Sequence, residues 1–218
     1  KVTGQTFADQ RLVVYGAGGL GREVGEMVRR INERHRFWRL LGFVDDGGAS
    51  GDLGGSEFLG GLEFIKGFNS PLDVAIAIAN PAAKRRLYET LKRDCPNVTF
   101  PSVIDTEARL SSRVSLDEGV IISHFCSVSV EVRLGRCVFL NTGTHVGHDT
   151  TIGDFSSVMP NVDISGNVTV GSDALIGVNS AILQGVAVGS GATVGMGAIV
   201  MTPVPEGCTV LGNPARKF

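Results

Sequence analysis

The residues best suited to chemistry are a histidine, an aspartate and a glycine. His148 and Asp149 are adjacent, and Gly166 follows His148 by eighteen residues. Acyl transfer needs a base that takes a proton from the attacking group and an N–H group that stabilises the developing oxyanion. A histidine supplies the base, a glycine leaves its N–H open, and an acidic neighbour holds the imidazole in one tautomer. The set predicts acyl transfer if residues eighteen positions apart are close in space.

A six-residue repeat indicates that they are close. Every sixth position from Leu110 to Val200 is Leu, Ile or Val, and the residue four positions after each is small or β-branched. This period belongs neither to an α-helix nor to a strand alone, but is typical of a solenoid whose short strands turn a corner every six residues. Three hexads make one coil, so residues eighteen apart stack about 4.8 Å apart. We therefore expect His148 and Gly166 to be neighbours on one corner.

The three other histidines fit the role of base less well. His35 lies late in a predicted helix and is expected at the surface. His124 occupies a different corner, because twenty-four residues separate it from His148. His145 should point outward from a flat face, where we expect it to contact a neighbouring subunit.

The residues before the repeat have a different pattern. Segments 11–15, 40–44 and 73–79 are predicted to be buried strands, and helical patterns separate them. A helix should begin after Asn80, a capping residue, with Pro81 in its first turn. Alternating strands and helices predict a parallel sheet with crossover helices. We therefore expect a βαβαβ half-Rossmann domain before the solenoid.

A glycine-rich loop joins the first strand to the first helix. It contains Gly16, Gly18, Gly19 and Gly21. Glycines in this context let the backbone approach a diphosphate at a helix N-terminus, and Asp45 or Asp46 could accept hydrogen bonds from a ribose or base. About ninety residues make only one half of a dinucleotide fold, so we expect one nucleotide rather than NAD. The alternative is a tight turn that binds no ligand.

Composition excludes several classes of protein. Hydrophobic residues make up 43% and charged residues 19% of the chain, with a net charge of −2, so no basic surface predicts nucleic-acid binding. No segment has the length of a membrane span, and the N-terminus has no apolar signal region. The four cysteines lack metal-like spacing, and Cys126 should pack inside the solenoid. We expect a cytoplasmic protein without a metal.

Three segments together resemble one protein family: residues 16–23, 147–155 and 212–216. The chain resembles the hexapeptide-repeat nucleotide-sugar N-acetyltransferases of bacillosamine and perosamine synthesis and the related sialic acid O-acetyltransferases. The resemblance implies a left-handed parallel β-helix over residues 98–218, after a nucleotide-sugar-binding domain over residues 1–97. It also implies polysaccharide biosynthesis, acetyl-CoA as the acyl donor and a homotrimer with active sites between subunits.

The resemblance also implies roles for single residues. His148 corresponds to the catalytic base, Asp149 to the acidic residue beside it and Gly166 to the amide that faces the thioester. Contacts with acetyl-CoA are implied at Ser157, Gly166, Val178 and Met196. Ser157 departs from the family pattern, because some relatives have a histidine there.

The resulting hypothesis is acetyl transfer from acetyl-CoA to the 4-amino group of a nucleotide-linked 4-amino-4,6-dideoxy sugar, with His148 as general base. One alternative is O-acetylation of sialic acid or a similar glycan, since a hydroxyl acceptor needs the same corner. Another is a non-catalytic β-helix scaffold, and a nicotinamide oxidoreductase fits the glycine loop alone. The sequence leaves open UDP, dTDP or GDP as the nucleotide, the stereochemistry of the sugar and the length of the acyl chain.

Overall fold

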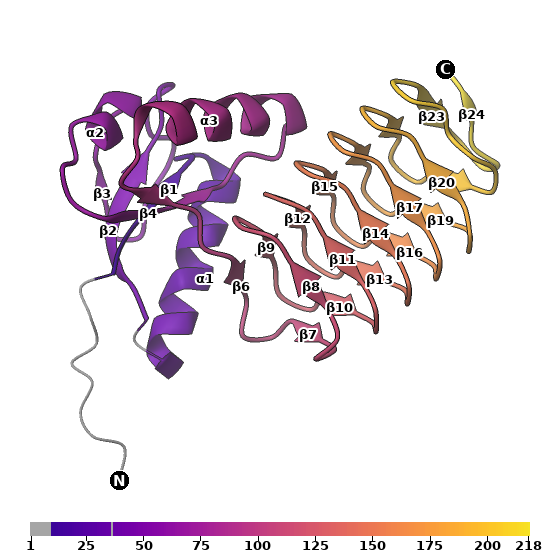
Figure 1. Ribbon diagram of the computed structural model, residues 1–218, viewed down its shortest axis with the longest axis horizontal. Helices are drawn as coiled ribbons and strands as arrows, with labels where there is room; N and C mark the ends of the chain where they lie inside the picture. The colour runs from indigo at the N-terminus through magenta and orange to yellow at the C-terminus, as the bar shows by residue number, and fades with distance from the viewer. Residues whose placement is uncertain (1–9, 36) are drawn as a thin grey trace, which may run out of the picture.

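The computed structural model describes residues 10–35 and 37–218, which form an α/β unit followed by a left-handed parallel β-helix (Figure 1). The α/β unit has one parallel sheet of strand order β3-β2-β1-β4-β5. Its strands are β1 (Arg11–Tyr15), β2 (Arg39–Val44), β3 (Glu57–Phe58), β4 (Leu72–Ile76) and β5 (Val98–Thr99). Its helices are α1 (Gly19–His35), α2 (Leu62–Lys66) and α3 (Pro81–Asp94).

The predicted strand–helix alternation of this unit is confirmed, with differences at its edges. The third predicted strand ends at Ile76 rather than at residue 79. Helix α3 begins as expected, because the Asn80 side chain accepts a hydrogen bond from the Ala83 amide at 2.9 Å. Strand β3 and helix α2 were not predicted. Strand β5 lies just beyond the predicted division at residue 97, and the division into domains stays a prediction.

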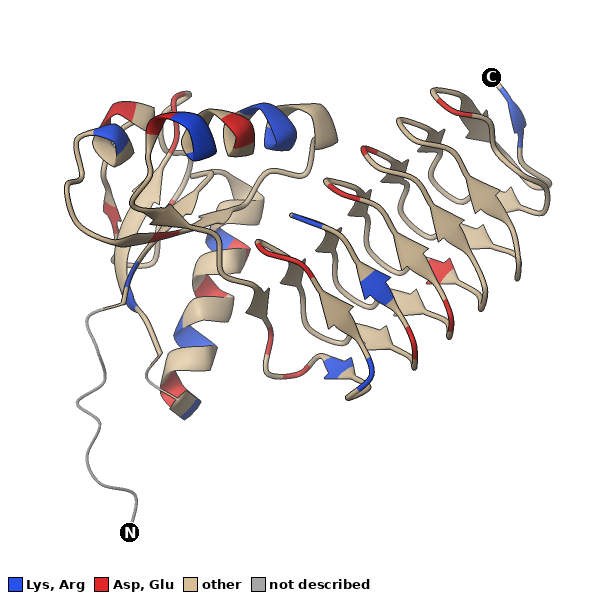
Figure 2. Cartoon of the chain, viewed as in Figure 1, with Lys and Arg blue, Asp and Glu red and all other residues tan. Residues whose placement is uncertain are grey.

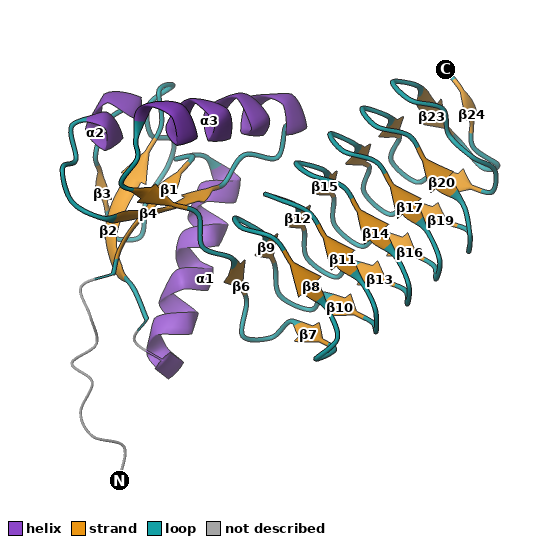
Figure 3. Ribbon diagram, in the orientation of Figure 1, coloured by secondary structure: helices purple, strands orange, loops and turns teal. Residues whose placement is uncertain are grey.

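The β-helix has three sheets, one for each side of the prism (Figure 3). The sheet beneath the α/β unit, which we call the covered sheet, contains β6 (Val103–Ile104), β9 (Ile121–Ile122), β12 (Phe139–Leu140), β15 (Ser157–Val158), β18 (Leu175–Ile176), β21 (Thr193–Val194), β23 (Thr209–Leu211) and β24 (Arg216–Lys217). The histidine sheet contains β7 (Arg109–Leu110), β10 (Ser127–Val128), β13 (His145–Val146), β16 (Asp163–Ile164), β19 (Ala181–Ile182) and β22 (Ile199–Val200). The threonine sheet contains β8 (Ser115–Leu116), β11 (Arg133–Leu134), β14 (Thr151–Ile152), β17 (Thr169–Val170) and β20 (Ala187–Val188).

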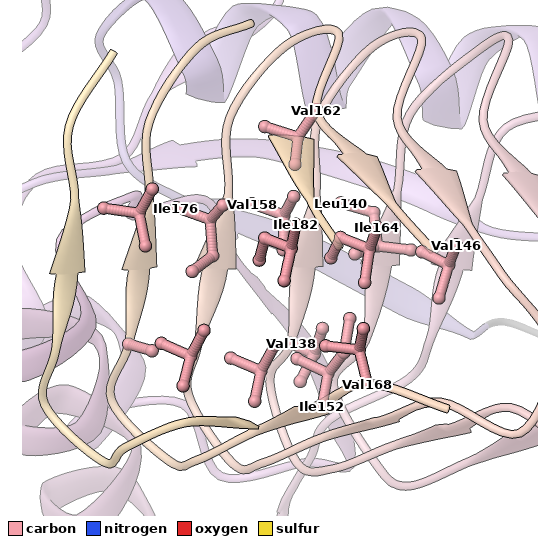
Figure 4. Packing of buried hydrophobic residues seen from close by; sticks show 14 of the residues in the cluster. Val138, Leu140, Val146, Ile152, Val158, Val162, Ile164, Val168, Ile176 and Ile182 are labelled. Carbon is pink, nitrogen blue, oxygen red and sulfur yellow. The ribbon is translucent and has the colours of Figure 1, made fainter. Parts of the chain in front are cut away.

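The six-residue repeat builds the core of this prism. In β13 and β16, Val146 pairs with Ile164, so residues eighteen apart are in register as predicted. The second residue of most strands points to the axis and is buried, and Figure 4 shows these aliphatic side chains stacked along the interior. Burying one such side chain stabilises the fold by about 1.5–3 kcal/mol. The coil geometry is therefore a direct result of the aliphatic series.

The second inward series contains polar residues whose hydroxyls are satisfied. Thr150 donates to the Ser165 carbonyl at 3.1 Å, and Ser156 donates to the Gly171 carbonyl at 2.7 Å. Both residues are fully buried, and buried hydroxyls need such partners. Cys126 is 1% exposed, which confirms that it packs inside the solenoid.

The α/β unit packs on the covered sheet. Ile121 and Phe139 point outward from that sheet and join the apolar cluster of β1 and α1. Figure 1 shows α3 lying along the same side of the β-helix. Charged side chains are frequent on the helices and on the first coils, as Figure 2 shows, whereas residues 174–205 contain none. Among residues 10–35 and 37–218, no helix is both long and apolar enough to cross a membrane.

Candidate active site

His148 and Asp149 form a hydrogen-bonded pair on the corner between the histidine and threonine sheets. Nδ1 of His148 lies 2.7 Å from Oδ2 of Asp149, and both side chains are about half exposed, at 49% and 52%. An ionised carboxylate only accepts hydrogen bonds, so Nδ1 carries a hydrogen atom and donates a hydrogen bond to Asp149. Nε2 of His148 is then left with a free lone pair, which is the arrangement that a general base requires.

Gly166 lies directly beneath this imidazole, as the repeat predicts. A Cβ atom added at Gly166 would lie 2.6 Å from Nε2 of His148. The Asn167 amide donates to the His148 carbonyl at 2.8 Å and fixes the two corners to each other. Within residues 10–35 and 37–218, the Gly166 amide donates to no other group. A free lone pair and a free N–H are therefore neighbours on one exposed corner.

Gly147 keeps this amide accessible. A Cβ atom added at Gly147 would lie 2.5 Å from the Gly166 nitrogen. That distance is shorter than Cβ contacts in real structures, so any side chain at position 147 would displace the next coil or cover its amide. The glycine after Val146 thus has a packing role and also leaves space at the corner.

The four glycines of the nucleotide-binding loop divide into two pairs. A Cβ atom at Gly16 would lie 2.6 Å from the Ala77 carbonyl oxygen, and one at Gly21 only 1.8 Å from the Gly16 carbonyl oxygen. These two positions need glycine for packing. Gly18 and Gly19, by contrast, face open space, with 3.9 Å to the nearest neighbour at Gly18 and nothing within 4 Å at Gly19. The loop thus offers an open backbone surface at the start of α1.

Asp45 and Asp46 hold this loop and its neighbourhood together. Asp45 accepts hydrogen bonds from the Ala17 amide at 2.9 Å and from the Gly47 amide at 2.8 Å. Asp46 accepts from the Tyr15 hydroxyl at 2.6 Å and from the Leu62 amide at 2.8 Å. The hydrogen bond from Tyr15 lowers the pKa of the Asp46 carboxyl. Both carboxylates therefore have structural partners, and their roles as ligands of a ribose or base stay predictions.

Ser157, where a coenzyme contact is predicted, is buried in this chain, and its contact with coenzyme stays a prediction. This residue has no exposed surface, and the Lys84 ammonium donates to its hydroxyl at 2.8 Å. The reason is that α3 packs over β15, so the outer side of Ser157 belongs to the contact between the two units. A coenzyme could reach this hydroxyl only if α3 moved away.

Val178 and Met196 lie on another corner, between the covered and histidine sheets. Val178 is partly exposed and Met196 is 76% exposed, so both can contact a ligand. One chain does not bring them to His148, because the whole histidine sheet separates the two corners. Their contacts with coenzyme stay predictions.

The sequence analysis did not identify Lys84 as a buried residue. Lys84 is 1% exposed, and burial lowers the pKa of its ammonium group to about 7. A signal was present in the sequence, because Leu87, Tyr88 and Leu91 follow Lys84 at helical spacing and form the buried face of α3. Long-range docking, which this spacing does not reveal, decides what the lysine contacts.

The described residues contain no cluster of titratable side chains typical of a metal site. Among residues 10–35 and 37–218, no group of three or more His, Cys, Asp or Glu side chains could hold an ion.

The fold and the catalytic corner of His148, Asp149 and Gly166 together define a left-handed β-helix acyltransferase with a small α/β domain at its N-terminus.

Comparison with known proteins identifies the family of the chain. Residues 11–91 match the profile of the PglD N-terminal domain, and residues 167–201 match the hexapeptide repeat of succinyl-transferase. WeeI from Acinetobacter baumannii AYE is 32% identical, over 96% of this chain and 100% of WeeI, with a TM-score of 0.86. The chain therefore belongs to the hexapeptide-repeat N-acetyltransferases of nucleotide-linked amino sugars, as its three sequence segments predicted.

Two further relatives are informative. The acetyltransferase domain of PglB from Neisseria gonorrhoeae FA1090, solved in complex with acetyl coenzyme A, is 28% identical over 97% of this chain and 100% of that one, with a TM-score of 0.88. GDP-perosamine N-acetyltransferase from Escherichia coli O157:H7 is 32% identical over 148 residues, which span 67% of this chain and 66% of that enzyme. The predicted fold class is confirmed by these similarities and by the strand topology.

Proposed function

We propose that the protein transfers an acetyl group from acetyl-CoA to the 4-amino group of a nucleotide-linked 4-amino-4,6-dideoxy sugar. The observation that carries this proposal is the free Nε2 of His148 beside the free amide of Gly166. The acetyl coenzyme A complex of the Neisseria domain supports the donor, and the name of the Escherichia coli relative supports the class of acceptor.

The reaction follows from the geometry of the corner. The neutral amine of the sugar attacks the thioester carbonyl carbon, and the negative charge that develops on the carbonyl oxygen accepts a hydrogen bond from the Gly166 amide. Nε2 of His148 takes the proton that the amine loses as the C–N bond forms. When the C–S bond breaks, the imidazolium returns this proton to the leaving thiolate. Asp149 stabilises the imidazolium through its hydrogen bond to Nδ1.

The site is formed between two copies of the chain in this proposal. His148 lies on one corner of the histidine sheet, whereas Val178 and Met196 lie on the other. A coenzyme can contact both sets only if the second corner comes from a neighbouring copy. A homotrimer with three clefts between adjacent β-helices satisfies this requirement and uses the exposed apolar Met196 as a contact.

The small domain binds the nucleotide in the same proposal. The open backbone at Gly18 and Gly19 lies at the start of α1, and a helix N-terminus attracts a diphosphate. The pair of glycines that packing does not require is the pair available to a ligand.

The test is release of free thiol from acetyl-CoA in the presence of UDP-, dTDP- or GDP-linked 4-amino-4,6-dideoxy sugars, with free sialic acid as the contrasting acceptor. We expect rapid release with one nucleotide amino sugar and none with sialic acid. Release with sialic acid alone would instead identify an O-acetyltransferase. No release with any acceptor, and no binding of acetyl-CoA, would identify a scaffold.

A further inference from the structure

A polar pocket lies on the outer face of the histidine sheet, beside the catalytic corner. Its volume is about 210 Å³. The residues that matter to its chemistry are Ser127, Ser129, His145, Gly147, Asp163 and Ser165. None of their side chains has a role in the reaction described above.

The register of the sheet places this pocket next to the reacting groups. His145 pairs with Ser127 on one side and with Asp163 on the other, so these three side chains form one row across the sheet. The remaining wall includes Gly147 and Ser165, which directly precede His148 and Gly166 in the chain. A ligand group in the pocket therefore lies beside the reacting group at the catalytic corner.

In the part of the chain that the structure describes, the polar side chains of the pocket have no partners. Among residues 10–35 and 37–218, no hydrogen bond or ion pair occupies the Asp163 carboxylate or the His145 ring, and the three serine hydroxyls are equally free. Asp173 differs, because Arg85 binds its carboxylate in two hydrogen bonds of 2.7 and 2.6 Å. The pocket thus presents unused donors and acceptors, which is what recognition of a polar ligand requires.

The chemistry of the pocket residues indicates which part of the nucleotide sugar or of acetyl-CoA the pocket would bind. Hydroxyls, an imidazole and a carboxylate suit a ligand rich in hydroxyl groups. The carboxylate of Asp163 would repel a phosphate, and the lining includes no lysine or arginine. The volume is below the roughly 300–1,000 Å³ of sites for drug-sized ligands, so it suits one ring rather than a whole nucleotide sugar.

The next coils of the same sheet argue against the coenzyme arm as the occupant. Leu183 and Met201, which are 51% and 53% exposed, continue the Ser165 column one and two coils further on. The apolar half of the face is the better surface for an aliphatic chain or for a neighbouring copy. The polar half, with Asp163 and His145, is left for a hydroxylated ring.

We propose that this pocket binds the sugar ring of the acceptor, with Asp163 and His145 hydrogen-bonded to its ring hydroxyls. This inference rests on the proposed function, because it assumes that the ring carries the amine that His148 deprotonates. In a 4-amino-4,6-dideoxyhexose the carbon next to the amine carries the C3 hydroxyl. Asp163 accepts a hydrogen bond from this hydroxyl, and the two residues select acceptors that retain it.

The experiment measures KM for the nucleotide sugar and for acetyl-CoA in the Asp163→Asn and His145→Gln variants. Loss of a hydrogen bond to a charged group predicts a rise of about 10-fold or more in KM for the sugar after Asp163→Asn, with KM for acetyl-CoA unchanged. The matched control is Asp117→Asn, which changes another exposed carboxylate of the β-helix outside the pocket. For an acceptor without the C3 hydroxyl, the unchanged protein should show the same rise in KM for the sugar. Asp163→Asn should not raise the KM for that acceptor further.

The contrary outcomes are distinct. An unchanged KM for the sugar overturns the inference and leaves the proposed function standing, provided that the unchanged protein acetylates the sugar. A rise only in KM for acetyl-CoA assigns the pocket to the coenzyme, and a changed sedimentation coefficient assigns it to a contact between copies. If the unchanged protein acetylates no nucleotide amino sugar, the proposed function and this inference both fail.

Discussion

Two corners of the β-helix occupy the same place in the repeat and do different work. His148 and Asp154 each lie two residues after an aliphatic strand residue, and Asp149 and Phe155 follow them with left-handed φ angles of 57° and 62°. Asp149 is half exposed and bonded to His148, whereas Phe155 is 1% exposed. The two corners have similar backbone conformations, so their different environments result from their side chains. The corner of Asp154 and Phe155 packs against the α/β unit, whereas the corner of His148 and Asp149 stays exposed.

At the docking corner, Arg136, Asp154 and Asp173 all have charged partners. Arg136 binds Asp154 through its guanidinium, and Arg85 of α3 lies 4.2 Å from the centre of the Phe155 ring. Arg85 also binds Asp173 on the next coil. At the catalytic corner, by contrast, Nε2 of His148 and the Gly166 amide have no partner among residues 10–35 and 37–218. At this corner an imidazole lone pair and a backbone N–H therefore lie side by side, and this pairing distinguishes the candidate site from the docking corner.

Apart from His148→Asn, Gly166→Ala gives the largest expected effect on kcat. The new Cβ atom would lie 2.6 Å from Nε2 of His148, and a mobile imidazole moves aside more easily than backbone. The chain should fold, but kcat should fall about 10-fold or more because base and amide no longer face the same point. The measurement is kcat for thiol release together with the melting temperature.

The matched control is Ser172→Ala, because Ser172 lies beneath Asp154 as Gly166 lies beneath His148. This variant should keep the rate of the unchanged protein. Full activity of the Gly166→Ala protein would contradict the claim that the His148 imidazole and the Gly166 amide act together in catalysis.

Lys84→Met tests the docking side through the pH dependence of stability. The pKa of Lys84 is about 7 in the folded protein and 10.5 without burial, so the unfolded chain binds more protons between these values. The contribution of Lys84 to the free energy of unfolding therefore rises with pH from about 7 to 10.5 and is flat below 7. Its full size is a few kcal/mol. Lys84→Met should remove this rise, as measured by urea unfolding at pH 6.5, 8 and 9.5.

A matched control for this variant is Lys92→Met, on the exposed side of the same helix. That protein should keep the pH dependence of the unchanged one. Identical slopes for Lys84→Met and the unchanged protein would show that Lys84 is not buried in solution.

Asp173→Asn should give the smallest effect. The pair with Arg85 has two hydrogen bonds, but both side chains are about one-third exposed, at 32% and 30%. Exposed pairs contribute about 0.2–1 kcal/mol, and we expect a loss at the upper end of that range because of the two-bond geometry. The measurement is the urea midpoint, with kcat as the second readout. A fall in kcat at unchanged stability would contradict the claim that the docking corner has a structural role and no catalytic one.

Periodicity explains which parts of the structure could be predicted from the sequence. The aliphatic series fixes which side chains point to the axis, and the number of residues in a coil then places His148 over Gly166. Both depend on local spacing. Asn80 likewise predicted the start of α3, because capping acts within one turn.

Contacts between distant segments explain what could not be predicted. Ser157 has the spacing of an outward-facing residue, yet it is buried because α3 lies on it. Asp45 and Asp46 follow a strand as ligands of a nucleotide would, yet their oxygens accept hydrogen bonds from the chain itself. Neither outcome can be read from residues near in sequence. The roles of His148 and Asp149 in the reaction stay predictions.

The most direct test of the central claim compares His148→Asn with His35→Asn in thiol release from acetyl-CoA, using the nucleotide 4-amino sugar that the unchanged protein prefers. Asparagine keeps a polar side chain of similar reach but cannot accept the proton. His35 is the control, since it is exposed in the last turn of α1, outside the β-helix. The account predicts that kcat falls by a factor on the order of 10² or more for His148→Asn and stays near its original value for His35→Asn. Equal activity of the two variants would contradict it.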